Sequence, residues 1–248
     1  MSFKMKLLYL FAGTLSLVFG IVPAASAMHI MEGYLPAGYC IAWGALCVPF
    51  LLAGFLSIKR TLEKRRNLIT LLAMSGAFIF VISSLKIPSA TGSCSHMTGT
   101  GLGAILFGPF AVSILGLIVL LFQALLLAHG GLTTIGANTF SMAIAGPFVS
   151  FGVYLLCKKA RLNQRVTVFL AAALGDLFTY CITACQMALA HNADTTFGTA
   201  FAKFLVVYAP TQLPLAVIEG ILTVVIIMGL ETYAKPELHA IGYIKESR

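Results

Sequence analysis

Residues 59–85 read KRTLEKRRNLITLLAMSGAFIFVISSL, a basic segment followed directly by an apolar run. The run from Leu68 to Leu85 contains no charged residue. It is about as long as a helix must be to cross the hydrocarbon core of a bilayer, which takes roughly 20 apolar residues. The basic residues before it belong on the cytoplasmic side under the positive-inside rule. This stretch therefore predicts a membrane-spanning helix and the direction in which the chain crosses.

The composition of the whole chain agrees with a membrane protein. Of its 248 residues, 59% are hydrophobic and 10% are charged, and the mean hydropathy is +0.97. Such a chain has too little polar surface to fold as a water-soluble globule. About six to eight spans account for its length and leave no large soluble domain. The lysines and arginines behind the net charge of +8 occur in short clusters without interleaved aromatic residues, so we interpret them as topology signals and expect no nucleic-acid partner.

Two basic segments determine the predicted topology. The second, Lys158 to Arg165, is expected in the cytoplasm like the first. The chain is then outside near His96 and inside again by Lys158, which requires an odd number of crossings. Besides the run already described, the clear spans are Tyr39 to Ile58, Val166 to Leu189 and Leu213 to Leu230, and between the two basic segments only two further apolar blocks occur, Gly101 to Ala128 and Asn138 to Leu156.

The block from Gly101 to Ala128 is therefore expected to divide into two passes. Gly108-Pro109 is the predicted break, because proline removes a helix hydrogen bond and clashes with the preceding turn. The piece before the break is short, so we expect a tilted or partly re-entrant helix buried against its neighbours. The predicted fold is an all-α integral membrane protein of about seven transmembrane helices, with Phe197 to Ala209 as a short interfacial helix before Pro210.

The first 27 residues have the three parts of a cleavable signal peptide. Lys4 and Lys6 form a basic start, an apolar run follows, and Ala25-Ser26-Ala27 presents small residues where a signal peptidase cleaves. We therefore divide the chain into a signal peptide, 1–27, and a transmembrane metal-capture domain, 28–248. An uncleaved anchor helix is the alternative. Cleavage yields a multi-pass protein of the cell membrane with its mature N-terminus outside and its C-terminus in the cytoplasm.

A histidine in the second position of a mature chain is a strong chelator. His29 offers its ring Nδ1 and its backbone nitrogen, and the free amine of Met28 adds a third nitrogen. Amine and amide close a five-membered chelate ring, and amide and Nδ1 close a six-membered one. Planar all-nitrogen coordination suits Ni²⁺ and Cu²⁺, and it suits Co²⁺ when the ligand field is strong. The amide nitrogen binds only after losing its proton, so metal binding should weaken at low pH.

A fourth ligand is available on the same predicted outer side. His96 is our candidate, because its small neighbours let the backbone approach closely. A solvated or locally hydrogen-bonded histidine is the alternative interpretation. Cys94 and Met97 are softer alternative ligands. Glu32 can also reach a metal ion, but we expect it to begin a helix or to make a hydrogen bond behind the ligands.

Three motifs carry a family resemblance: MHIMEGYLP at 28–36, SHMTG at 95–99 and AHGGLTTIGANTFSM at 128–142. Over essentially the whole mature chain, the sequence resembles the CbiM family, the cobalt-binding substrate-capture (S) components of energy-coupling factor (ECF) transporters. The resemblance implies a seven-helix subunit that binds Co²⁺ outside the cell and feeds cobalamin biosynthesis. It also implies partners, namely a CbiQ-like transmembrane coupling subunit, CbiO-like ATPase subunits and a small CbiN-like accessory membrane protein.

The ligands of that family correspond to Met28, His29 and His96 in this chain. His129 also lies in a family motif, and we assign it, like Asn138, to loop packing or gating. The resemblance alone favours cobalt, because the Irving-Williams order ranks Ni²⁺ above Co²⁺ at such a site. A nickel-specific subunit of the same type is therefore an alternative.

No catalytic site is predicted. The sequence has no phosphate-binding G-x-x-x-x-G-K-[ST], so ATP hydrolysis is expected only in partner subunits, and it has no H-E-x-x-H, which argues against a metalloprotease. The remaining alternative is a gradient-driven secondary transporter in which Asp176 and Glu219, with Gln186 or Gln212, form an ion path, since intramembrane carboxylates are functional candidates. Carboxyl groups that fix helix packing are the simpler interpretation.

Overall fold

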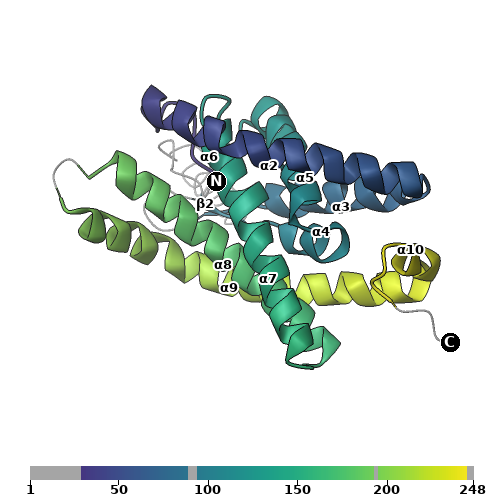
Figure 1. Cartoon of the computed structure of the whole chain (residues 1–248). Helices are drawn as coiled ribbons and strands as arrows, with labels where there is room; N and C mark the ends of the chain where they lie inside the picture. Colours follow the sequence, from purple (N-terminus) through teal and green to yellow (C-terminus); the bar gives the residue numbers. More distant parts are fainter. Residues whose placement is uncertain (1–28, 89–93, 193–194, 245–248) are drawn as a thin grey trace, which may run out of the picture.

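The computed structural model describes residues 29–88, 94–192 and 195–244, which are mostly helical (Figure 1). The predicted signal peptide, Met28 and the last four residues lie outside the described residues. The helices are α2 (Ala37–Lys64), α3 (Leu68–Ser84), α4 (Thr100–Phe107), α5 (Pro109–Leu127), α6 (Ile135–Asn138), α7 (Gly146–Lys159), α8 (Gln164–Ala190), α9 (Phe197–Tyr233) and α10 (Lys235–Ala240). A π-helical segment, η2 (Thr139–Ala145), joins α6 to α7, and two short strands, β1 (Ile87–Pro88) and β2 (Cys94–Ser95), pair antiparallel.

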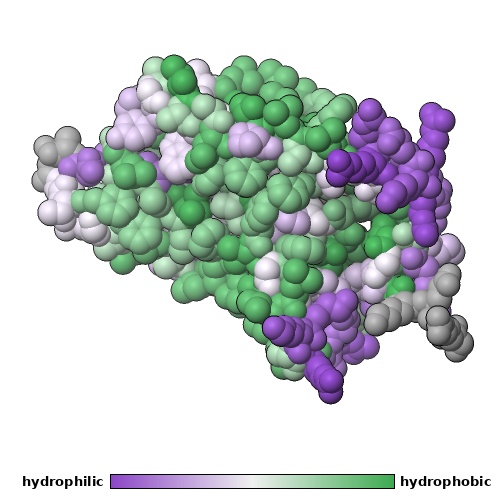
Figure 2. Space-filling view, in the orientation of Figure 1, coloured by the Kyte–Doolittle hydropathy of each residue, from purple (hydrophilic) through white to green (hydrophobic). Residues whose placement is uncertain are grey.

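The surface of the bundle is apolar around its middle, and hydrophilic residues gather at the ends of α2 and α7 (Figure 2). On α2, the side chains of Ile41, Leu52 and Phe55 are 72%, 63% and 60% exposed. A contiguous apolar surface of this extent is expected where lipid is the solvent. Within the described ranges, five helical units are long and apolar enough to cross a bilayer, and α3 is a shorter apolar helix. These findings confirm an all-α, multi-pass membrane protein.

The predicted break at Gly108-Pro109 is confirmed. Gly108 adopts a φ of 82°, and Pro109 is the first residue of α5, where a missing N–H is tolerated. The eight residues of α4 make a helix only about 12 Å long. It is too short to span a bilayer alone, so seven full crossings are not confirmed. Every residue from Thr100 to Leu106 is buried, so α4 lies inside the bundle and away from lipid.

Small residues allow the close packing of α4. A Cβ added at Gly101 would lie 2.9 Å from Cα of Ala172 in α8, and one added at Gly103 would lie 2.9 Å from Cγ2 of Val112 in α5. Ala104 beside them is completely buried. The short helix is therefore fixed between α5 and α8, and the segment that leads into it starts from a rigid support.

The prediction of a separate interfacial helix at Phe197 to Ala209 is wrong. These residues begin α9, a single helix of 37 residues that continues through Pro210. The proline removes one helix hydrogen bond, but α9 packs along α8 (Figure 1), and the hydroxyl of Tyr180 donates a hydrogen bond to the carbonyl of Leu205. Packing against α8 thus keeps the helix continuous across Pro210, where the sequence had suggested that one helix ends and another begins.

Candidate metal centre

Three histidines from three different segments meet inside one end of the bundle. His29 precedes α2, His96 lies between β2 and α4, and His129 follows α5. Their side chains are 2%, 0% and 1% exposed, and one ring nitrogen of each lies within 4.8 Å of the others. Among the described residues, no other group of three or more histidine, cysteine or acidic side chains has this geometry. Segments predicted to face outward together are therefore also packed together.

The rings of His29 and His96 face each other through one nitrogen of each. Nδ1 of His29 faces Nε2 of His96 at hydrogen-bonding distance, and the ring centroids are 4.3 Å apart. Nδ1 of His96 lies 2.9 Å from the carbonyl oxygen of Met97. A carbonyl only accepts, so this Nδ1 carries the proton, and the lone pair of Nε2 accepts a hydrogen bond from Nδ1 of His29. A backbone acceptor behind the imidazole is the usual way in which proteins orient a metal-binding histidine.

The backbone next to His29 is held by Asn138, at the end of α6. The Asn138 side chain accepts a hydrogen bond from the Ile30 N–H (2.8 Å) and donates one to the Ile30 carbonyl oxygen (3.0 Å). The hydroxyl of Thr134 donates to the same carbonyl oxygen at 2.6 Å. The side chains of Ile30 and Leu35 are buried as well. Polar and apolar contacts together fix this segment, and thereby the direction of the His29 ring.

Glu32 joins the N-terminal segment to the loop after α5. Its Oε2 accepts a hydrogen bond from the Thr133 N–H at 3.2 Å, and the hydrogen bonds from Thr133 lower the pKa of this exposed carboxyl group. A Cβ added at Gly131 would lie 2.6 Å from the backbone nitrogen of Glu32, so the two backbones are in contact. Glu32 therefore links the N-terminal segment to the loop after α5 and lies outside the histidine cluster.

The segment that carries His96 is held by a buried carboxylate of α9. Glu219 accepts hydrogen bonds from the backbone N–H groups of Thr98 (2.6 Å) and Gly99 (3.0 Å). It also accepts one from the Thr98 hydroxyl at 2.9 Å. Glu219 is completely buried, and a buried carboxylate needs such donors to replace water. These three bonds fix the backbone directly after His96.

Asp176 of α8 reaches the same segment through Gln212 of α9. Nε2 of Gln212 lies 2.6 Å from Oδ2 of Asp176 and 3.3 Å from the carbonyl oxygen of His96. Both carboxylates considered for an ion path are therefore connected to the His96 segment. Glu219 contacts it directly, and Asp176 is connected to it through the side-chain amide of Gln212. Gln186 of α8 donates instead to the carbonyl of Ala137 at 3.0 Å.

Burial keeps the three imidazoles neutral. They lie in loops outside the membrane-spanning helices, and loss of hydration lowers the pKa of His29 well below its usual value, with His96 and His129 adding to the effect. Burial likewise lowers the pKa of His96 to about 4 and that of His129 to about 2. Neutral imidazole is the form that binds metal ions. At neutral pH the cluster therefore offers lone pairs without first releasing a proton from a ring.

The predicted ligands are placed only in part. His29 and His96 come together, whereas the amine of Met28 lies outside the described residues. Of the softer alternatives, Met97 is buried and its carbonyl group contacts the His96 ring. The side chain of Cys94 is not among the parts that the structure describes.

The closeness of His129 to the other two histidines was not predicted from the sequence. Nothing in the pattern of the loop after α5 gives its distance from His96, which lies on a separate part of the chain. The one available signal was the pair of glycines after the histidine. Gly130 has a φ of 81°, and a Cβ added to it would lie 3.5 Å from Cβ of His29. A glycine here lets the loop lie directly against the N-terminal segment.

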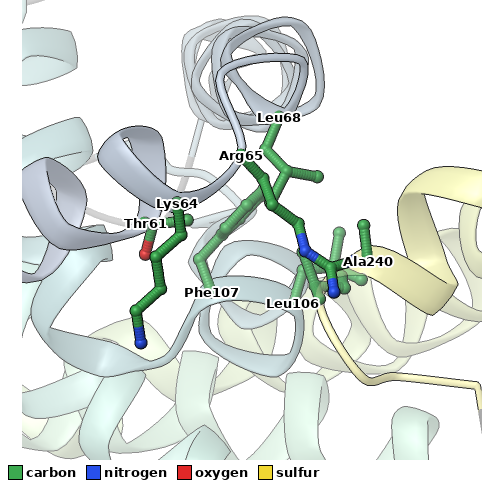
Figure 3. Close-up of a pocket in the computed structure, with 8 residues that line it drawn as sticks. Thr61, Lys64, Arg65, Leu68, Leu106, Phe107 and Ala240 are labelled. Atoms are coloured by element: carbon green, nitrogen blue, oxygen red, sulfur yellow. The ribbon is translucent and has the colours of Figure 1, made fainter.

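A cavity lies at the C-terminal end of α2, away from the histidines (Figure 3). Its volume is about 240 Å³, and it lies between the ends of α2 and α4, the start of α3, and α10. Lys64 and Arg65 line it, and neither forms an ion pair within the described ranges. Positive charge is thus concentrated at the end that the positive-inside rule places in the cytoplasm, and this cavity is separate from the histidine cluster.

Comparisons with known proteins agree on one family. The family described as cobalt uptake substrate-specific transmembrane region (CbiM) matches residues 29–238. A cobalt transport protein CbiM from Lachnoclostridium phytofermentans is 66% identical over 245 residues, 98% of each chain, and one from a Nostoc species is 56% identical over 222 residues, 89% of this chain and 85% of the relative. A crystal structure of a transition metal transporter aligns with a TM-score of 0.72 and 27% identity, covering 82% of this chain and 92% of the other.

Proposed function

Since this chain belongs to the CbiM family, the cobalt uptake substrate-specific transmembrane regions, we propose that it captures Co²⁺ as the substrate-binding subunit of an ECF-type importer that supplies cobalamin biosynthesis. The observation that carries the proposal is the buried pair of imidazoles, His29 and His96, whose ring nitrogens face each other. Co²⁺ is the transported substrate in this proposal, and Ni²⁺ is the alternative substrate at the same site.

The proposed ligand set consists of four nitrogens. The amine of Met28 and the backbone nitrogen and Nδ1 of His29 provide three, and Nε2 of His96 provides the fourth. Cleavage of the signal peptide after Ala27 supplies the amine. The hydrogen bond from His96 Nδ1 to a backbone carbonyl supports the assignment of Nε2 as the ligand atom, because it leaves Nε2 without a proton.

Proton release accompanies binding at this proposed site. The amide of His29 must lose its proton to bind, and so must the fraction of the Met28 amine that is charged. The imidazoles are already neutral, so they release none. Occupancy of the site by metal therefore falls as the pH falls. The amidate of His29 is the only ligand in the proposed set that carries a negative charge.

Release of the ion has a simple structural basis in the proposal. The His29 segment is anchored to α6 through Asn138, whereas the His96 segment is anchored to α9 through Glu219. A displacement of α9 relative to α6 separates the two imidazoles and divides the ligand set. The coupling subunit and the ATPase subunits are proposed to cause this displacement from the cytoplasmic end, where the basic residues gather, with the mature N-terminus outside and the C-terminus inside.

A gradient-driven secondary transporter is the second candidate, and the burial of Asp176 and Glu219 in the bundle favours it. We prefer the coupling-factor proposal because Glu219 already accepts three hydrogen bonds from the His96 segment. A carboxylate engaged in this way is poorly available to a moving ion.

The test begins with the mature protein purified in detergent, its N-terminus sequenced, and Co²⁺ and Ni²⁺ titrated by calorimetry. We expect a start at Met28, one ion per chain, and loss of high-affinity binding in His29→Ala and His96→Ala. His191→Ala is the matched control, because this ring caps the end of α8 with a bond to the Met187 carbonyl and lies outside the cluster. A start at Met1, or full affinity in His29→Ala, would refute the site.

Uptake into vesicles separates the two transport mechanisms. Uptake that requires the ATPase subunits and survives a protonophore supports the coupling-factor proposal. Uptake by this chain alone that a protonophore abolishes would instead support the secondary transporter.

A further inference from the structure

The cavity at the C-terminal end of α2 has no part in the proposed capture of the ion. Two of the residues that line it, Lys64 and Arg65, are basic, and none of the eight is acidic. Within the part of the chain that the structure describes, neither basic side chain has an ion-pair partner. Both side chains are exposed, and they extend from the end of α2 into the cavity (Figure 3). The cavity is therefore cationic and accessible to a ligand.

The charge of the cavity stays positive when the nearby helix ends are counted. The helices α2, α4 and α10 end at the cavity, and a helix C-terminus carries about half a negative elementary charge. The helix α3 begins there and adds a positive partial charge of similar size. Lys64 and Arg65 contribute two full positive charges. A net charge of about +1 remains, which one phosphodiester group would neutralise.

A second cavity, near the start of α8, lacks this excess of positive charge. Its volume is about 170 Å³, and Arg165 lines it together with Glu231 of α9. An acidic side chain of the same chain is thus available there to offset the basic one. The cavity of Lys64 and Arg65 has no such acid, so its positive charge is left for a ligand from outside the chain.

The rest of the cationic cavity is apolar. Leu68 and Leu106 are buried in its wall beside Phe107. Leu56 of α2 and Ile69 of α3 are exposed apolar side chains on the two helices that border it. A free inorganic anion gains little from such a surface, whereas the glycerol and acyl carbons of a phospholipid lose unfavourable contact with water there. The volume of about 240 Å³ is several times what one water molecule requires, which leaves room for a phosphate with its glycerol.

We propose that this cavity binds the phosphodiester head group of an anionic phospholipid, with the acyl chains along α2 and α3. The guanidinium of Arg65 binds two phosphate oxygens at once, and the ammonium of Lys64 acts as a point charge beside it. Backbone hydrogen bonds fix Arg65, because its N–H donates to the Thr61 carbonyl at 3.0 Å and its carbonyl accepts from the Leu68 N–H at 3.1 Å. The positive-inside rule places this end in the cytoplasm, where the leaflet is rich in anionic lipid.

Native mass spectrometry of the purified protein in neutral detergent, titrated with dioleoylphosphatidylglycerol or dioleoylphosphatidylcholine, tests the proposal. We expect one phosphatidylglycerol to bind more tightly than phosphatidylcholine. Its affinity should fall about fivefold in Lys64→Gln and in Arg65→Gln, as removal of one basic side chain near a membrane surface implies. Arg66→Gln is the matched control, since it removes the same charge from the same turn but does not line the cavity. This control should stay within about twofold of the wild type.

Three results would overturn the proposal. Equal affinity of the wild-type protein for the two lipids would show that the head group is not recognised, and this comparison decides even if a variant does not fold. A loss in Arg66→Gln equal to that in Arg65→Gln would show that general surface charge attracts the lipid.

The third result concerns a different occupant. Glycerol 3-phosphate, which lacks acyl chains, should not displace the bound phosphatidylglycerol. Displacement at similar concentrations would identify a soluble phosphate as the ligand. Variants of Lys64 and Arg65 that keep lipid binding but no longer co-purify with the coupling subunit would likewise overturn the proposal, because the cavity would then bind a partner protein.

Discussion

Replacing Asn138 with alanine tests how the N-terminal segment is held over the metal site. The substitution removes two hydrogen bonds, one accepted from the Ile30 N–H at 2.8 Å and one donated to the Ile30 carbonyl at 3.0 Å. The carbonyl keeps its 2.6 Å hydrogen bond from Thr134, so only the N–H loses its partner. His29 stands directly before this group, and its ring direction depends on the same short stretch of backbone.

The size of the effect follows from that single unpaired group. A buried amide without a partner costs about 1–3 kcal/mol. The cost applies only when the segment is docked, because water satisfies the N–H when it is released. Since about 1.4 kcal/mol corresponds to a tenfold change in affinity, the apparent Kd for Co²⁺ should rise roughly 5- to 150-fold.

Calorimetric titration of the purified mature protein measures this change. Asn163→Ala is the matched control, because the Asn163 side chain also accepts a backbone hydrogen bond, from Arg165 at 2.9 Å, but does so at the start of α8, away from the histidines. The control should lose some thermal stability and keep its Co²⁺ affinity. An unchanged Kd in a folded Asn138→Ala protein would refute the idea that this amide holds the metal-binding segment in place.

Three further results are expected. The metal-free protein should melt at a lower temperature in detergent at pH 5 than at pH 7.5. Burial lowers the pKa of all three histidines in the folded protein, so the unfolded chain binds more protons and stability is lost as the pH falls below about 6.5. Equal melting temperatures at the two pH values would contradict this expectation. Glu219→Ala should weaken Co²⁺ binding about tenfold, since it leaves the donors of Thr98 and Gly99 without an acceptor. Glu219→Gln retains one acceptor, so its Co²⁺ affinity should lie between those of the wild type and Glu219→Ala. Wild-type affinity in both variants would show that this anchor is dispensable. Gly136→Ala should destabilise the protein by about 1–3 kcal/mol in thermal unfolding, because its Cβ would lie 2.6 Å from the backbone of α2, whereas Gly152→Ala meets no atom within 4 Å and should be neutral or slightly stabilising.

The break between α4 and α5 illustrates what can be predicted from the residues alone. Proline lacks an N–H and glycine adopts a positive φ at little cost, so Gly108-Pro109 favours the end of one helix and the start of another, as the structure has it. The lipid-facing helices are predictable for a similar reason, because the transfer of an apolar side chain into hydrocarbon depends mainly on the side chain itself. The pairing of His29 with His96 followed from topology, since both segments were predicted on one side of the membrane.

Sequence alone therefore determined the properties that depend on single residues or short runs. These are the membrane class, the basic segments, the helix break and the choice of His29 and His96 as candidate ligands. Only the tertiary structure decided that α9 is continuous, that His129 completes a cluster, and that Glu219 holds the backbone of Thr98 although the two are 121 residues apart. The physical reason is that a hydrogen bond or a ring contact requires atoms within a few ångströms. Hydrophobicity along a chain determines which segments enter the membrane, but not which side chains meet there.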